Sequence, residues 1–204
     1  MKIFLLNGTP PDYRLAECSV VGSWTKGGKP CKACQLTTQD LTEPLLVEWE
    51  PGSDAIGDFS WGGYTAVVKD EVKSFFERRH LECQFGIVKV VPFSERTKKS
   101  KVPQVAFPYT GPVLHWLRPT EFVELDEKQS CVNLRVDCQE CGLKDYTFRR
   151  TGIVIKATAL GNRKLFRIKQ FGKSKATFVT EEVATQLTHA GFSNFHCHEA
   201  GVIV

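Results

Sequence analysis

Short apolar runs that alternate with polar residues, or that are rich in β-branched residues, recur along the chain and predict many short strands. They occupy residues 2–6, 45–49, 64–68, 86–91, 120–125, 143–148, 152–157, 165–168 and 176–179. Glycine and proline break up the intervening segments, most densely before residue 31 and from residue 103 to residue 119. The pattern indicates sheets of short strands joined by loops.

Two segments show helical spacing instead, each directly after a predicted strand. In residues 70–80, acidic residues precede the apolar face and basic residues follow it, as the helix dipole favours. In residues 180–190, Thr180 is a suitable N-cap and Gly191 ends the helix. We therefore expect an α+β fold with mixed sheets that contains two strand-helix-strand modules.

The two modules align with each other at one offset. Val68, Val72 and Phe76 match Val179, Val183 and Leu187, since 179 minus 68 and 187 minus 76 both give 111. An internal duplication is one interpretation; the other is that two unrelated amphipathic units align by chance. We expect an N-terminal half, residues 1–110, and a C-terminal half, residues 111–204, or one compact unit made of both.

Composition adds a location but little about partners. The chain has 204 residues and a formal net charge of +4, which is far from the charge of an obligate nucleic-acid binder. The apolar stretch at its start is too short to be a secretory signal, and no apolar run is long enough for a membrane helix. We expect a cytoplasmic protein with reduced cysteines and no membrane contact.

Two C-x-x-C motifs carry the clearest chemical signal. Cys31 and Cys34 form the first, and Cys138 and Cys141, followed by Gly142, form the second. Each motif places two thiolates on one side of a tight turn, and two such turns complete a tetrahedron. Four thiolates favour zinc and leave no position for a substrate, so we predict a structural Zn²⁺ site of zinc-ribbon type that holds the two halves together.

The spacing leaves alternatives open. Zinc ribbons separate their pairs by roughly fifteen to twenty residues, whereas here 103 residues lie between Cys34 and Cys138. A shared site therefore requires a folded segment between the knuckles. The alternatives are two redox pairs, two disulfides, or reduced cysteines that pack. A redox role is the least favoured, because no helical pattern follows either pair.

Other ligand-type residues are weaker candidates. His196 and His198 share one face of a predicted strand beside Glu199, and a second metal there competes with a plain exposed strand end. The isolated cysteines are expected to pack as small apolar residues; they are Cys18, Cys83 and Cys131. Cys197 is expected to pack inward.

No nucleotide-binding, metalloprotease or serine-hydrolase motif occurs in the sequence. A zinc deaminase would need a histidine before Pro30, and the first histidine is His80. We therefore predict a protein that is not an enzyme. An enzyme would require a pocket that holds a residue such as His115 or His196 with a perturbed pKa.

Basic residues suggest a rival function. Lys98, Lys99 and Lys101 lie in a loop bounded by prolines, and Arg149 and Arg150 follow the second knuckle. A zinc-ribbon module that binds nucleic acid would use such residues. No aromatic residues alternate with the lysines for base stacking, which favours a solvated loop.

The order of these motifs resembles the double-CXXCG motif family, which is best represented in myxobacteria. The resemblance rests on the two knuckles and on the terminal segments 165–167, 178–183 and 187–192. One departure is Gln35, which stands where the family has glycine. Glycine there allows positive φ in the turn, whereas glutamine adopts it only with strain.

The resemblance implies a bacterial immunity protein, since some members of this family neutralise toxins exchanged between neighbouring cells. The partner would then be one cognate protein toxin, bound through a protein interface. A nuclease toxin usually presents a basic cleft and calls for an acidic inhibitor, so a mildly basic chain favours a different toxin class.

Overall fold

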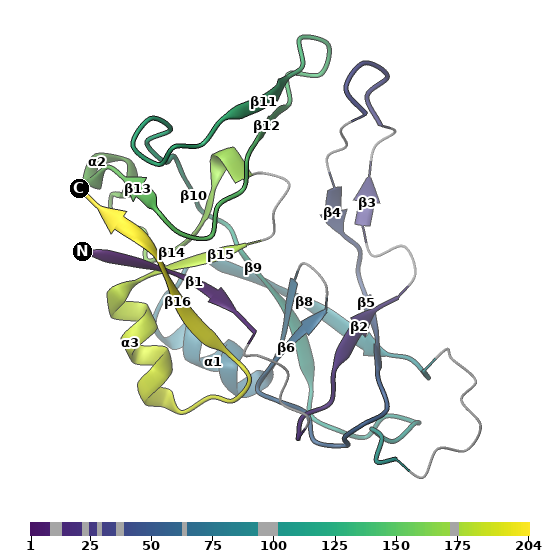
Figure 1. The fold of residues 1–204 in the computed structure, drawn as a ribbon. Helices are drawn as coiled ribbons and strands as arrows, with labels where there is room; N and C mark the ends of the chain where they lie inside the picture. Colours follow the sequence, from purple (N-terminus) through teal and green to yellow (C-terminus); the bar gives the residue numbers. More distant parts are fainter. Residues whose placement is uncertain are drawn as a thin grey trace.

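The computed structural model describes residues 1–8, 14–21, 25–27, 30–35, 39–62, 65–93, 102–171 and 176–204. Within these residues, two six-stranded sheets with both parallel and antiparallel pairs are accompanied by few helices, as Figure 1 shows. Two short hairpins complete the strands. The predicted mixed sheets are therefore confirmed, and the molecule is mostly β with a minor α component.

The first sheet contains five strands from the N-terminal half and one strand, residues 114–119, from the C-terminal half. Its order is β2 (Cys18–Val20), β5 (Leu45–Trp49), β8 (Cys83–Val90), β9 (Leu114–Pro119), β7 (Thr65–Lys69) and β6 (Phe59–Gly62). Helix α1 (Asp70–Arg78) connects β7 to β8. An added Cβ at Gly62 would lie 2.6 Å from a methyl carbon of Val20, so the edge strands β6 and β2 approach each other. The sheet thus curls toward a barrel.

The second sheet contains strands from both ends of the chain. Its order is β10 (Phe122–Val123), β14 (Leu165–Ile168), β15 (Thr177–Thr180), β1 (Lys2–Asn7), β16 (His196–Ile203) and β13 (Ile153–Ile155). Helix α3 (Glu181–Ala190) connects β15 to β16, and the short α2 (Ala157–Leu160) and η1 (Lys169–Phe171) flank β14. Asp126, which follows β10, donates its N–H to the carbonyl of Val154 in β13 at 2.8 Å. This sheet therefore curls as well.

Three apolar clusters explain why these elements pack as they do. One cluster, which includes Val47 and Trp116, lies inside the curled first sheet, and another, which includes Ile155 and Phe178, lies inside the second. The third lies between the sheets and is shared, because both α1 and α3 bury their apolar faces in it beside strands of each sheet. Figure 1 shows the two helices next to each other.

Both predicted helices form, with apolar faces as expected. Gly191 adopts the left-handed conformation at the end of α3, with φ of 70°. Thr180 occupies the N-cap position of α3, but its side chain makes no capping hydrogen bond and its hydroxyl is buried without a partner. The extended backbone of Thr180 continues β15 into the helix, so the hydroxyl faces the interior.

Other predictions needed correction. The strand expected at 120–125 is shortened to Phe122–Val123, and the one at 152–157 ends at Ile155 because α2 begins at Ala157. Strand β9 was not expected, since prolines surround it in sequence. The loop expected around the first knuckle is a hairpin of β3 (Thr25–Gly27) and β4 (Gln39–Leu41). The division of the chain near residue 110 stays a prediction.

Candidate metal centre

Each C-x-x-C motif forms the end of a hairpin that projects from the body of the molecule. The first knuckle connects β3 to β4, and the second connects β11 (Leu134–Asp137) to β12 (Lys144–Tyr146). Figure 1 shows both hairpins on the same side of the molecule. We call them the first arm (β3, β4 and residues 30–35) and the second arm (residues 134–146). The strand predicted at 143–148, after the second knuckle, forms as β12.

The two knuckles have the same backbone turn. Gln35 donates its N–H to the carbonyl of Cys31 at 2.8 Å, and Gly142 donates its N–H to the carbonyl of Cys138 at 2.8 Å. The φ angles are 58° at Gln35 and 69° at Gly142. Glutamine therefore adopts the left-handed conformation that glycine adopts in the second knuckle. Its side-chain amide donates to the carbonyl of Lys32 at 3.1 Å and stabilises the turn.

The structure brings all four cysteine sulfurs together. The Sγ atoms of Cys31 and Cys138 are 3.7 Å apart, and those of Cys34 and Cys141 are 3.6 Å apart. All four lie within 4.8 Å of one another, and none is in a disulfide. With Zn–S bonds of about 2.3 Å, a regular tetrahedron places sulfurs about 3.8 Å apart. Two of the sulfur pairs have this separation, and all four sulfurs lie close enough together to hold one metal ion.

Hydrogen bonds favour the thiolate form at one of the four positions. The backbone N–H of Cys141, helped by the thiols of Cys141 and Cys34 and by the N–H of Glu140, lowers the pKa of the Cys138 thiol to about 7 against the cost of desolvation. Cys138 is buried, whereas Cys141 is exposed. The centre is therefore anchored on one side and open to solvent on the other.

The remaining cysteines lie apart from this cluster. Burial raises the pKa of Cys18 and Cys83 to about 12 and that of Cys197 to about 11, so these thiols stay protonated. Cys18 packs in the apolar cluster of the first sheet, as expected. Cys131 departs from the expectation because it is exposed and has a φ of 50°.

Histidines do not form a second centre in the described part of the chain. His196 and His198 lie on the exposed face of β16 with ring centroids 6.3 Å apart, and Glu199 pairs with Lys2 instead. Among the described residues, the group of three or more potential metal ligands is the set of four cysteines.

His115, which the enzyme hypothesis named, lies 2.9 Å from a carboxylate oxygen of Asp70 at the start of α1.

A pocket of about 250 Å³ lies beside β5 and the end of β8. Its walls are Trp49 and residues 90–93 and 104–107, none of which is ionisable. Neither His115 nor His196 lines it. The pocket therefore lacks the histidine that the enzyme hypothesis named.

Of the basic residues proposed to bind nucleic acid, the structure describes only some. Lys98, Lys99 and Lys101 lie outside the described residues. Arg149 donates to the carbonyls of Ser130 and Cys131 at 3.3 Å each, so its guanidinium supports a turn of the body.

Comparison of the sequence with models of known families gives no match, and comparison with curated proteins gives none. The resemblance to the double-CXXCG family therefore stays a prediction. Within the described residues, no helix has both the length and the apolar character needed to cross a membrane.

Proposed function

We propose that Cys31, Cys34, Cys138 and Cys141 bind one Zn²⁺ as a closed structural site. The observation that carries the proposal is the close approach of the four sulfurs, two pairs of which are 3.7 and 3.6 Å apart and all of which lie within 4.8 Å of one another. Thiolate sulfur is a soft donor, and a four-sulfur tetrahedron is the coordination of structural zinc and of iron–sulfur sites. Zinc is favoured because two C-x-x-C knuckles on hairpins are the usual frame of a zinc ribbon.

We further propose that the protein acts by binding another protein and not by catalysis. Four protein ligands fill a tetrahedral ion, so the ion has no open position at which to activate water or a substrate. The resemblance to the double-CXXCG family supports a specific version, in which the chain neutralises a cognate toxin in the cytoplasm of a bacterium. Nucleic-acid binding through the knuckles is the rival proposal, and the engagement of Arg149 with the body weakens it.

Metal analysis tests the first proposal. Protein purified without added metal should contain one zinc per chain by plasma mass spectrometry. A variant with Cys138→Ser and Cys141→Ser should contain less than about a tenth of that amount, because two of four ligands are lost. Cys83→Ser is the matched control, since Cys83 lies outside the cluster and should leave the zinc content unchanged. Purified protein that contains iron and absorbs in the visible range would replace zinc with an iron–sulfur site.

Co-expression tests the proposed partner. The reading frame next to this gene should encode a product that stops growth when expressed alone, and the chain should restore growth and form a complex with the purified product. A harmless neighbouring product would contradict the immunity proposal. Binding to duplex DNA or single-stranded RNA that weakens steeply between 50 and 200 mM salt would support the rival.

A further inference from the structure

The two sheets repeat one strand arrangement. Strands β5, β8, β9, β7 and β6 follow one another in the first sheet, and β13, β16, β1, β15 and β14 follow one another in the second. In each series the first pair is parallel and the next three pairs are antiparallel. Strands β2 and β10 also match in direction. Strand β2 pairs antiparallel with β5, the first strand of its series. Strand β10 pairs parallel with β14 and therefore runs antiparallel to β13, the first strand of the other series.

The register of the pairing repeats as well. Ile3 faces Thr180 across β1 and β15, and Leu114 faces Lys69 across β9 and β7. The differences are equal, since 114 minus 3 and 180 minus 69 both give 111. Lys69 and Thr180 are the N-cap residues of α1 and α3, with φ and ψ of −73° and 163° in one and −72° and 162° in the other.

In each sheet, a strand near the centre comes from the opposite half of the chain to the strands beside it. Each repeat begins with one strand, β1 or β9, and continues through a knuckle to a strand-helix-strand unit. Strand β1 lies between β15 and β16, and β9 lies between β7 and β8. Each repeat therefore places its first strand in the sheet of the other.

The cysteine cluster follows the same relation. Contacts join equivalent residues, Cys31 to Cys138 and Cys34 to Cys141, and both pairs are separated by 107 residues in sequence. Equivalent atoms meet in this way only near the axis that relates two copies. The cluster thus lies where two copies of one arm come together at their ends.

We infer that the chain is a tandem duplication with exchanged first strands, in which a metal ion acts as a reversible clasp between the arms and is not needed to join the two halves. The clasp rests on the proposed metal site; the strand exchange does not.

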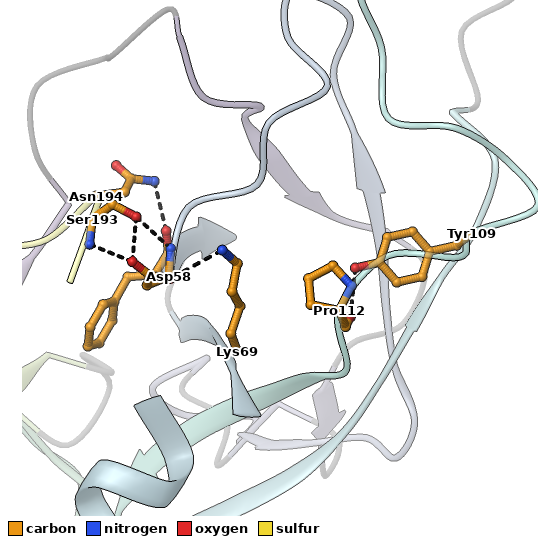
Figure 2. Close-up of polar contacts among 7 residues, drawn as sticks. Asp58, Lys69, Tyr109, Pro112, Ser193 and Asn194 are labelled. Carbon is orange, nitrogen blue, oxygen red and sulfur yellow. Dashed lines mark hydrogen bonds and ion pairs between the residues drawn. The ribbon is translucent and has the colours of Figure 1, made fainter. Parts of the chain in front are cut away.

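The body has its own connections between the halves. Leu6 of β1 and Leu117 of β9 lie in the shared apolar cluster and are 2% and 3% exposed. A polar contact joins the halves nearby, as Figure 2 shows: the Asp58 carboxylate accepts hydrogen bonds from the N–H and the hydroxyl of Ser193 at 2.8 and 2.7 Å. Asn194 adds a bond to the carbonyl of Phe59 at 2.9 Å. None of these contacts involves the four cysteines.

Near the knuckles, in contrast, the arms have little buried apolar surface, and none of residues 30–35 in the first arm is buried. In the second arm, Leu134 and Cys141 are exposed and Tyr146 is only half-buried. Segments with few buried apolar contacts open at low free energy, whereas buried central strands open only with the whole fold. Loss of the metal should therefore free the arms and leave both sheets intact.

Hydrogen exchange by mass spectrometry on the full chain, with zinc bound and after chelation, tests the clasp. Peptides of both arms should exchange at least about tenfold faster after chelation, whereas peptides covering β1, β9, β15 and β16 should change less than about twofold. Cys141→Ser should reproduce the chelated pattern, and Cys83→Ser the zinc-bound one. Faster exchange in β1 and β9 on chelation would mean that the metal holds the halves together. Arms that exchange equally with and without metal would also overturn the clasp.

A second hydrogen-exchange experiment tests the strand exchange and does not depend on the metal. Leu5 and Trp116 are equivalent, since 116 minus 5 gives 111, and each is buried inside one curled sheet. Leu5→Ala should speed exchange in β15 and β16, and Trp116→Ala should speed it in β7 and β8. If Leu5→Ala affects β7 and β8 first, β1 belongs to its own half and the inference fails. If the protein binds no zinc, the metal clasp and the proposed zinc site are both wrong. The comparison of Leu5→Ala with Trp116→Ala would still test the strand exchange.

Discussion

Gln35 and Gly142 occupy the same position in the two knuckles, yet only one of them is glycine. Both have positive φ, which costs an ordinary residue roughly 1–2 kcal/mol. The resemblance to the double-CXXCG family predicted this strain, because Gln35 stands where that family has glycine. The hydrogen bond from its side chain to the carbonyl of Lys32 was not predictable, because it depends on the conformation of the turn. At the scale of one residue, the structure shows how the first knuckle manages without glycine.

Gly142→Ala is expected to weaken zinc affinity about fivefold, which corresponds to about 1 kcal/mol of backbone strain. An added Cβ at this position meets no atom within 4 Å, so strain is the only cost. Competition with a chromophoric chelator measures the affinity. Gln35→Gly should change it less than about threefold, since relief of strain is offset by the lost side-chain bond and by a more flexible unfolded chain. Unchanged affinity in the alanine variant would contradict the strain argument.

Asp58 gives a prediction that depends on pH. Burial opposes its ionisation, but hydrogen bonds from the N–H and hydroxyl of Ser193 and from Lys69 hold the pKa of Asp58 below its usual value. A lowered folded pKa stabilises the fold above the unfolded pKa of about 4, and this stabilisation is lost as pH falls through the folded pKa. Asp58→Asn should lower the free energy of unfolding by about 1–2 kcal/mol at pH 7.

Urea unfolding of this variant and the parent at pH 7, 5 and 3 measures the difference, which should shrink at the lowest pH. Glu124→Gln is the control, because Glu124 forms an exposed ion pair with Lys169 and should cost less than about 0.5 kcal/mol at pH 7. A constant difference between Asp58→Asn and the parent over the whole range would show that ionisation of Asp58 is irrelevant.

At the scale of elements, the exchanged strands β1 and β9 define the fold. Leu6 and Leu117 are equivalent residues of these strands and share one apolar cluster. Leu6→Ala and Leu117→Ala are each expected to lower the free energy of unfolding by about 2–4 kcal/mol, because each leaves a cavity in that cluster. Ile87→Ala, at a position 63% exposed, should cost less than about 0.5 kcal/mol. Urea unfolding measures all three, and a small loss for either leucine variant would mean that its strand contributes little.

Local pattern predicted the elements that act locally. The helices at α1 and α3 and the strands β1, β5, β7, β8 and β14 form close to the expected residues, since apolar spacing alone specifies them. Strand β9 was missed because Pro112 precedes it, Pro119 is its last residue, and its residues do not alternate strictly. Pairing partners were beyond the sequence, since the position of β1 between β15 and β16 depends on contacts with residues far along the chain.

The candidate centre shows the same division. Residue type and the C-x-x-C spacing were enough to select the four cysteines as one group. The meeting of the two knuckles across 107 residues follows from the equivalent placement of the two arms. We expected the ion to hold the halves together because the sequence does not show the apolar cluster that both sheets share. With that cluster joining the halves, we infer that only the arms depend on the metal.

The whole molecule should unfold in one step, because the shared cluster belongs to both sheets. Trp49, Trp61 and Trp116 lie in strands of the first sheet, so tryptophan fluorescence reports that sheet. Phe178→Ala, deep inside the second sheet, should lower the unfolding temperature seen by tryptophan fluorescence by the same amount as that seen by far-UV circular dichroism. Two separate transitions, with the fluorescence one unshifted, would show independent halves.

The central position of β1 has a consequence for synthesis. Residues 2–7 leave the ribosome long before their pairing partners, residues 177–180 and 196–203, are made. This apolar segment therefore stays without its partners while the intervening residues are translated, and exposed strands are prone to aggregate. Slow elongation or a crowded polysome should harm the yield of this chain more than that of a protein whose first strand pairs with the second.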